Sequence, residues 1–312
     1  MSVNQEFRFP SADGSTTLYG RTWAPEEGSP RAVLQIVHGI SEHIGRYDHL
    51  ARFMAGQGFF VAAEDHLGHG NTPENPEELG FTAEEKGWEK MTDNVHALHD
   101  RLKEQYPDLP YVLLGHSMGS FLARSYLIRY PGTVDACALL GTGQQPGLIL
   151  AAGRAACALE RKRLGSHGRS NLLQSLCFGA YNKQFKPNRT PSDWICSVDE
   201  VVDRYMADPF CQVQPTVTLM QDMMGGIHFN QNRENLKKMD RSTPILFLSG
   251  ALDPVGSNGK GVRQAYQSFL DVGCADVVLK LYPNGRHEMH NESNKGEVYR
   301  DLLAWMEQKL QL

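Results

Sequence analysis

Short apolar segments alternate with longer amphipathic segments along this chain. Continuous apolar runs of strand length, bounded by turn residues, predict six buried strands at 32–39, 59–65, 111–117, 136–141, 244–250 and 276–282. Apolar residues that recur at helical spacing predict helices at 45–57, 85–106, 118–129, 257–271 and 294–310. Because helices form the crossovers that parallel strands need, we predict an α/β fold with a mostly parallel sheet flanked by helices.

The N-terminal segment predicts a different kind of connection. Residues 7–10 and 16–25 are strand-like and are separated by a short turn at Asp13-Gly14, which is typical of an antiparallel hairpin. A loop this short cannot join parallel strands. Together with the six buried strands, this hairpin predicts an eight-stranded sheet.

The alternation of strands and helices stops between Gln144 and about Asn230. We therefore predict a helical cap inserted at 144–230, in a core that consists of residues 1–143 and 231–312. The first segment of the cap, 147–165, is apolar at one end and basic at the other. This pattern predicts either a lid helix that lines an acyl tunnel and transiently contacts a membrane surface, or an ordinary helix packed on the core.

The composition and charge of the chain indicate which binding partners and which cellular compartment to expect. The chain has 312 residues, of which 41% are hydrophobic and 21% are charged, as is typical of globular proteins. Its net charge of −5 provides no basic field for phosphates, so we expect no nucleic-acid partner. The N-terminus lacks the features of a signal peptide, and no segment reaches the roughly 18 consecutive apolar residues of a spanning helix. We therefore expect a cytoplasmic protein whose six dispersed cysteines are reduced, whereas no feature predicts an oligomeric state.

The most specific chemical motif is Gly115-His116-Ser117-Met118-Gly119, which lies between a predicted strand and a predicted helix. A G-x-S-x-G motif in this context is typical of a nucleophile elbow, a tight turn that raises the serine hydroxyl above a sheet. The flanking glycines leave room for that turn. We therefore predict that Ser117 is a nucleophile, and the alternative is an ordinary glycine-rich turn.

A serine hydroxyl needs a base, and the base needs an acidic partner that holds its tautomer. Asp253 follows the predicted strand 244–250 and His287 follows the last strand, so both lie at strand ends where α/β sheets bind ligands. We predict that Asp253 is the acid and His287 the base. The alternatives are a turn residue for Asp253 and a surface-loop histidine for His287, with His290 as its competitor.

Acyl transfer also needs N–H groups that hold the developing oxyanion. The amide of Met118, directly after the predicted nucleophile, is one expected donor. His38-Gly39 ends the strand 32–39 and allows a sharp turn, so we expect the Ile40 amide to be the other donor.

Five motifs follow one another along the chain: HGISEHIGRY (38–47), EDHLGHGNT (64–72), GHSMG (115–119), SGALDPV (249–255) and NGRHEMHNE (284–292). Together they resemble the monoacylglycerol lipase and lysophospholipase group of serine α/β-hydrolases, over nearly all of the predicted core. Within the insert, only NRTPSDW (188–194) is similar to bacterial members of that group.

This resemblance implies an α/β-hydrolase fold and a serine hydrolase that cleaves carboxylic esters through an acyl-enzyme without a cofactor. The implied substrate is a monoacylglycerol or a lysophospholipid-type lipid. The implied roles agree with those reached from strand ends and chain order: Ser117, Asp253 and His287 as the triad, with Ile40 and Met118 as oxyanion donors.

Other functions stay open because the insert has no assigned chemistry. An aminopeptidase or amidase of the same fold would need acidic residues to bind a free α-amine. A non-catalytic ligand-binding protein of the same fold is a further alternative. The acidic candidates of the insert are Asp193, Asp199, Glu200 and Asp203.

Several further groups have two interpretations each. Glu42, His43, Arg46 and Tyr47 could contact a substrate head group, or form a buried network that fixes the loop after residue 39. His66 and His69 lie beside Asp65, but no further ligands complete a metal site, so we expect a turn-stabilising role and no metal or cofactor. Flexible apolar side chains of the insert could line an acyl pocket or simply pack within the cap: Met206, Phe210, Met220, Met223, Met224 and Phe229.

Overall fold

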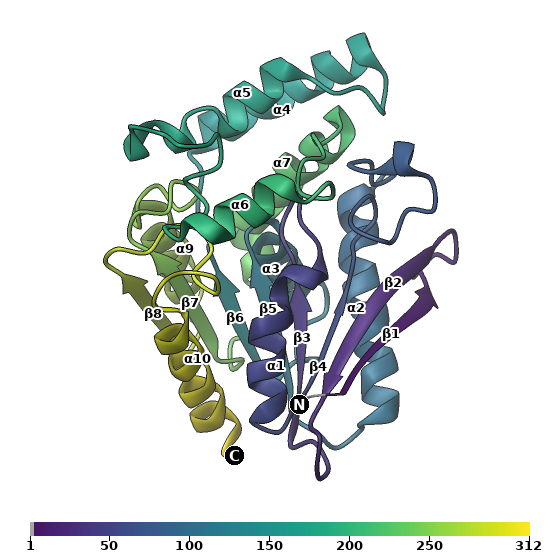
Figure 1. Ribbon diagram of the computed structural model, residues 1–312, viewed down its shortest axis with the longest axis vertical. Coiled ribbons are helices and arrows are strands. Elements are labelled where there is room, and N and C mark those ends of the chain that lie inside the picture. The colour runs from purple at the N-terminus through teal and green to yellow at the C-terminus, as the bar shows by residue number, and fades with distance from the viewer. Residues whose placement is uncertain (1–2) are drawn as a thin grey trace.

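One eight-stranded sheet forms the centre of the computed structural model, which describes residues 3–312 (Figure 1). The spatial order of its strands is β1-β2-β4-β3-β5-β6-β7-β8. The pairs β1–β2 and β2–β4 are antiparallel and the other pairs are parallel, which confirms the predicted sheet. The strands are β1 (Val3–Pro10), β2 (Thr17–Ala24), β3 (Ala32–Val37), β4 (Phe59–Glu64), β5 (Tyr111–His116), β6 (Ala136–Leu140), β7 (Ile245–Gly250) and β8 (Val277–Tyr282).

Helices cover both faces of the sheet. Trp88, Phe121 and Phe269 pack on one face, from α2 (Gly87–Gln105), α3 (Met118–Arg129) and α9 (Lys260–Asp271). Leu50 and Trp305 pack on the other, from α1 (Asp48–Gly56) and α10 (Lys295–Leu310). Every residue of strands β3 to β7 is therefore buried. This two-sided burial is the physical reason why these strands are continuous apolar runs in the sequence.

The segment between β6 and β7 contains helices α4 to α8. Figure 1 shows α4 to α7 over one end of the sheet, opposite the end at which the N and C labels lie. Helix α7 packs against α4 and also against the core helices α2 and α3. Residues 144–230 are called the cap below. The helices are α4 (Gly147–Leu164), α5 (Asn171–Phe178), α6 (Asp199–Ala207), α7 (Val217–Gln231) and α8 (Arg233–Leu236).

The described residues also form three short 3-10 helices: η1 (Ile44–Tyr47), η2 (Pro76–Glu78) and η3 (Tyr181–Phe185). Helix η1 leads directly into α1, so the single predicted helix 45–57 consists of a 3-10 turn followed by an α-helix. Within residues 3–312, no helix combines the length and the apolar character that crossing a membrane requires.

Candidate active site

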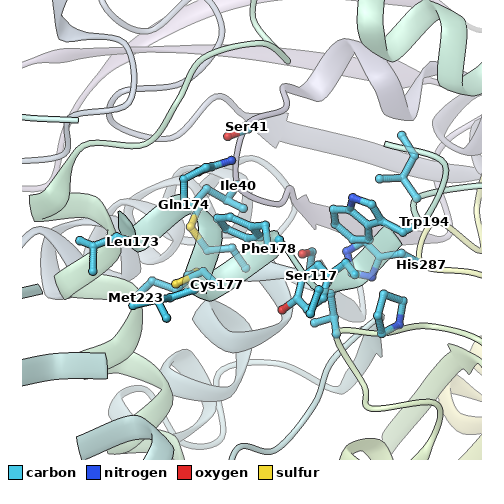
Figure 2. Close-up of a pocket in the computed structure, with 18 of the residues that line it drawn as sticks. Ile40, Ser41, Ser117, Leu173, Gln174, Cys177, Phe178, Trp194, Met223 and His287 are labelled. Carbon is cyan, nitrogen blue, oxygen red and sulfur yellow. The ribbon is translucent and has the colours of Figure 1, made fainter. Parts of the chain in front are cut away.

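Ser117 occupies the tight turn between β5 and α3. Its backbone has a φ of 53° and a ψ of −121°, a strained conformation for a residue other than glycine. A Cβ atom at Gly115 would lie 2.3 Å from the carbonyl oxygen of Gly119, and one at Gly119 would lie 2.0 Å from that of Val37. Only glycine therefore fits at both flanks of the turn, which places Ser117 at the wall of a cavity (Figure 2).

Asp253 and His287 lie in the loops that follow β7 and β8. His287 Nδ1 is 3.0 Å from Asp253 Oδ2, and Asp253 Oδ1 accepts a hydrogen bond from the Val255 amide. Because an ionised carboxylate only accepts, Nδ1 donates, and Nε2 of the neutral ring keeps its lone pair. Nε2 is buried without a hydrogen-bond partner among residues 3–312, and the ring lies next to Ser117 (Figure 2). An imidazole in this state can accept the proton of the serine hydroxyl.

Two opposing effects act on the pKa of His287. Burial disfavours the imidazolium, but the Asp253 carboxylate, together with the charges of Glu288 and Glu42, outweighs burial and raises the pKa above its ordinary value. The competitor His290 is stacked on Tyr47 with 4.6 Å between ring centroids, and burial lowers its pKa to about 3. Neither ring nitrogen of His290 has a hydrogen-bond partner in the described chain. Of the two histidines, only His287 is therefore paired with the acid.

The predicted oxyanion donors lie close to Ser117. Ile40 and Met118 both line the cavity, and their main-chain N–H groups donate no hydrogen bond to another group of residues 3–312. A Cβ atom at Gly39 would lie 2.9 Å from Ser117 Cβ, so the loop that carries Ile40 runs against the serine. Free N–H groups beside a nucleophile are the arrangement that stabilises negative charge on a substrate oxygen.

A buried network fixes the loop that carries Ile40. Glu42 Oε1 accepts hydrogen bonds from the Gly39 amide at 2.5 Å and from the Tyr47 hydroxyl at 2.7 Å. Burial raises the pKa of the Glu42 carboxyl, but the hydrogen bond with His116 and the charges around it hold that pKa well below its usual range. Glu42 is thus an ionised acceptor that holds the loop from within.

Arg46 connects this loop to the histidine loop. Its guanidinium is 3.1 Å from Glu42 Oε2, and it donates to both carboxylate oxygens of Glu288 at 2.5 and 2.8 Å. The predicted network is therefore confirmed for Glu42, Arg46 and Tyr47. His43 takes a different partner, because its Nε2 lies 2.8 Å from the Asp208 carboxylate of the cap.

The cap contacts the predicted base directly. The Trp194 ring packs against the His287 ring with 5.1 Å between centroids (Figure 2). The Glu288 amide donates to the Ile195 carbonyl oxygen at 2.7 Å, so the main chain of the cap also holds the loop of His287. Sequence reasoning missed Trp194, although it ends the motif 188–194 that resembles bacterial relatives.

The other neighbour of His287 is tied to the cap as well. The guanidinium of Arg286 donates to the carbonyl oxygen of Cys196 at 3.0 Å and to that of Asp193. The segment 193–197 of the cap therefore forms hydrogen bonds with both sequence neighbours of His287, Arg286 and Glu288.

A cavity of about 1160 Å³ lies between the core loops and the cap. Met223 and Met224 line it, as predicted. Four other predicted lining residues lie elsewhere: Met206, Phe210, Met220 and Phe229. For these residues the alternative of packing describes the structure, because Met220 and Met206 pack within two small clusters of the cap and Phe210 packs on the His43 ring. The apolar wall comes instead from residues that sequence reasoning missed: Leu150, Leu173, Cys177, Phe178, Trp194 and Ile227.

The charged groups of the cavity all belong to one network. Among residues 3–312, the charged side chains that line it are Glu42, Arg46 and Glu288, in addition to His116 and His287. The acidic candidates of the insert do not line it. Asp199 and Asp203 pair instead with Arg189 at the surface of the cap. The cap therefore presents no acidic group to an amine bound near Ser117.

The residues considered for a metal site stabilise a turn. Asp65 accepts hydrogen bonds from the Ile44 and Asn71 amides, each at 2.8 Å, and the His66 amide donates to His38 Nε2 at 3.0 Å. His66 Nε2 lies 3.1 Å from the His38 carbonyl oxygen and His69 Nδ1 lies 2.9 Å from the Leu67 carbonyl oxygen, so both rings contact the main chain, as the predicted turn-stabilising role requires. All six cysteines are free thiols, as predicted.

Comparison with known proteins agrees with this geometry. The family model described as serine aminopeptidase, S33, matches residues 28–294. The monoacylglycerol lipase of Mycolicibacterium smegmatis is 27% identical over 314 residues, which cover 98% of each chain. The monoglyceride lipase of Homo sapiens is 28% identical over 303 residues, which cover 96% of this chain and 89% of that one. The crystal structure of a highly thermostable carboxyl esterase from Bacillus coagulans, in complex with glycerol, matches with a TM-score of 0.91 at 30% identity and covers 99% of this chain and 100% of that one.

Proposed function

The chain belongs to the serine aminopeptidase S33 family of α/β-hydrolases and is a serine ester hydrolase, and we propose that its substrates are monoacylglycerols. The observation that carries this proposal is the apolar cavity that begins at Ser117 and continues under helices α4, α5 and α7. Residues 144–230 act in this proposal as the cap that holds the acyl chain, and the core supplies the chemistry.

The proposed reaction uses Ser117, His287 and Asp253. His287 Nε2 accepts the serine proton while Ser117 Oγ attacks the acyl carbonyl carbon, and the amides of Ile40 and Met118 hold the oxyanion. Asp253 keeps the proton on Nδ1 and stabilises the imidazolium. The imidazolium then protonates the leaving glycerol oxygen, and a water molecule repeats the sequence on the acyl-enzyme to release the fatty acid.

The charge of the cavity favours a neutral head group over a phosphorylated one. Arg46 is already shared by the Glu42 and Glu288 carboxylates, so the carboxylates and the guanidinium of the lining together carry one more negative than positive charge. A phosphate would meet uncompensated negative charge, whereas glycerol hydroxyls can exchange hydrogen bonds with carboxylates. The negative charge of the lining therefore favours a monoacylglycerol over a lysophospholipid. The proposed site likewise has no cap carboxylate that would mark an aminopeptidase.

The nucleophile is tested by labelling with a fluorophosphonate probe. Wild-type protein should be labelled and Ser117→Ala should not, because the probe forms a bond with an activated serine oxygen. Ser175→Ala is the matched control, since Ser175 also lines the cavity and is exposed. Labelling of Ser117→Ala at the wild-type level would overturn the assignment.

The substrate is tested separately with a turnover panel. We expect 1-oleoylglycerol to be hydrolysed with a kcat/KM more than about tenfold above that of 1-oleoyl lysophosphatidic acid, which corresponds to about 1.4 kcal/mol of discrimination. A proline arylamide should not be cleaved. Equal turnover of the two oleoyl lipids would contradict the neutral head group and leave the nucleophile untouched.

We further propose that the outer face of the cap contacts anionic lipid surfaces. Five large apolar side chains of α4 and α5 are 55–87% exposed: Leu148, Ile149, Leu159, Leu172 and Leu176. Ile149 and Leu176 also line the cavity, so this patch is continuous with the substrate site. Arg154, Lys162 and Arg163 are exposed on α4 and complement negative lipid head groups. Figure 1 shows α4 and α5 as the outermost helices of the cap.

Co-sedimentation with vesicles tests this contact. Wild-type protein should bind phosphatidylcholine vesicles that contain phosphatidylglycerol, and the double variant Leu159→Glu/Leu172→Glu should bind several-fold more weakly. Leu270→Glu is the control, because Leu270 is 36% exposed on α9, outside the cap. Turnover of a water-soluble ester should be the same in all three proteins. Equal vesicle binding by the double variant would overturn the contact.

A further inference from the structure

A second cluster of reactive side chains lies on α2, outside the cavity. His96, His99 and Asp100 occupy positions i, i+3 and i+4 of this helix and therefore share one face. One ligand atom from each lies within 4.8 Å of the others. We propose that this face binds one divalent transition-metal ion of the zinc class through His96 Nε2, His99 Nδ1 and an oxygen of Asp100.

The hydrogen bonds of His99 orient it as a metal ligand. Its Nε2 is 2.9 Å from the carbonyl oxygen of Thr133, which can only accept, so Nε2 carries a proton. A neutral His99 therefore directs its Nδ1 lone pair at Asp100 Oδ1, which is 3.0 Å away and also an acceptor. Two acceptors as close as His99 Nδ1 and Asp100 Oδ1 need a positively charged group between them, which is either a second proton on the His99 ring or a metal ion. Histidine ligands commonly donate their other N–H to a backbone carbonyl in this way.

His96 has a matching arrangement. Its Nε2 is 3.5 Å from Asp100 Oδ2, and its Nδ1 is 3.2 Å from the Tyr126 hydroxyl oxygen. The Thr133 hydroxyl lies 2.9 Å from the same oxygen and 2.8 Å from the Tyr130 carbonyl oxygen, which can only accept. Thr133 therefore donates to Tyr130, and the Tyr126 hydroxyl can donate to Thr133 Oγ1 and accept the His96 Nδ1–H. Stacking on Tyr130 at 3.8 Å between centroids holds the His96 ring in place.

The spacing of these atoms suits a tetrahedral ion. Zinc bonds to nitrogen and oxygen of about 2.0–2.1 Å place neighbouring ligand atoms about 3.3 Å apart. His99 Nδ1 is 3.0 Å from Asp100 Oδ1 and His96 Nε2 is 3.5 Å from Asp100 Oδ2, so each histidine lies near this distance from a different oxygen of the carboxylate. Water would complete the coordination, because Asp100 is 58% exposed.

A second triplet, His43, Asp208 and Cys211, does not meet the same condition. His43 Nδ1 accepts from the Gly45 amide at 3.2 Å, so the ring proton lies on Nε2, which donates to Asp208 at 2.8 Å. Both nitrogens are satisfied without a metal. This triplet therefore supplies the matched control.

The ion would stabilise the fold and leave ester hydrolysis unchanged. Tyr126 lies nine residues beyond Ser117, about 13 Å along α3, and Thr133 precedes β6. A metal on His96 and His99 would hold α2 against these two elements through the outer hydrogen bonds. We therefore expect Zn²⁺ to raise the thermal midpoint of the protein.

Calorimetric titration of EDTA-treated protein with ZnCl₂, together with Co²⁺ absorption, tests the proposal. We expect the protein to bind one equivalent of Zn²⁺ with a dissociation constant in the micromolar range. His99→Gln and Asp100→Asn should each weaken this binding about tenfold or more, and Cys211→Ser should leave it unchanged. Asp100→Asn carries the test if His99→Gln fails to fold, because Asp100 is largely exposed. Absence of binding, or an equivalent that depends on Cys211 and survives both α2 substitutions, would overturn the proposal.

Discussion

His287 is held from two sides, by the core through Asp253 and by the cap through Trp194. The core contact is a 3.0 Å hydrogen bond to a carboxylate whose other oxygen is held by an amide. The cap contact is ring against ring, with centroids 5.1 Å apart. The carboxylate raises the pKa of His287, and the burial to which Trp194 contributes opposes that rise. The two regions therefore act in opposite directions on the same proton.

The same contrast extends over the whole cavity. The charged side chains that line the cavity, such as Glu42 and Arg46, come from the core, whereas the cap contributes apolar side chains such as Leu173 and Phe178 and no charged one. Removing one partner of a buried charge leaves the other uncompensated, whereas removing an apolar contact has a graded cost. Substitutions in the core should therefore cause large losses of catalytic rate or of folding stability. Substitutions in the cap should cause smaller, graded changes, such as a change in the preferred acyl chain length.

The largest effect is expected for Asp253→Asn. Loss of the correct tautomer should lower kcat about 10⁴-fold. Because the base acts when neutral, wild-type kcat/KM should rise with pH through a midpoint above the ordinary histidine pKa of about 6.5. Removing the Asp253 carboxylate removes the largest of the effects that raise the His287 pKa, so the midpoint should fall. A pH–rate profile on a soluble ester measures both, and an unchanged midpoint would contradict the pairing.

Arg46→Met tests the core network by stability. Two buried carboxylates would lose their shared cation, and we expect unfolding free energy to fall by about 3–5 kcal/mol. The control is Arg21→Met, which removes a pair with Glu6 whose carboxylate is 61% exposed and should cost about 0–1 kcal/mol. Urea unfolding compares the two, and equal losses would remove the distinction between the regions.

Trp194→Ala tests the contact between the cap and His287 through the direction in which the His287 pKa shifts. Opening the ring to water should relieve the burial that lowers the His287 pKa, so the midpoint of the pH–rate profile should rise, opposite to Asp253→Asn. Looser positioning should lower kcat/KM by roughly tenfold to 100-fold. Trp194→Phe keeps a ring against His287 and should preserve the wild-type midpoint. A downward shift in Trp194→Ala would refute the opposition between core and cap.

Met223→Trp should give the smallest effect, a change of chain-length preference. The larger side chain shortens the apolar cavity, so kcat/KM should fall about tenfold for long acyl esters relative to butyrate. Met206→Trp is the control, because Met206 packs in a separate cluster of the cap and does not line the cavity. A parallel loss in both variants would show that the cavity does not select the chain.

The core was predictable because its signals are local. Buried strands are uninterrupted apolar runs, and the turn at Ser117 needs glycine on both sides, so these features are visible without the fold. Asp253 and His287 follow strands, and the structure brings them within hydrogen-bond distance. Their catalytic roles, the cap bounds 144–230 and the cytoplasmic location stay predictions.

The cap was less predictable because an apolar helix face does not reveal which surface it meets. Met220 and Met223 are three residues apart on α7, yet Met220 is buried in a cap cluster and Met223 lines the cavity. Trp194 was missed for a related reason, since its partner lies more than ninety residues away along the chain. Contacts of this kind depend on how the cap is placed over the core.

The bonds from Ile195 and Cys196 to the histidine loop limit how a lipid can enter. If the cap lifted as one body, the Glu288 and Arg286 bonds would break and the loop of His287 would lose its supports. The cavity also has an exposed apolar border at Ile149 and Leu176, which takes no part in these hydrogen bonds. Because the hydrogen bonds of Ile195 and Cys196 lie outside α4 and α5, we expect an acyl chain to enter beside these two helices while the catalytic groups stay assembled.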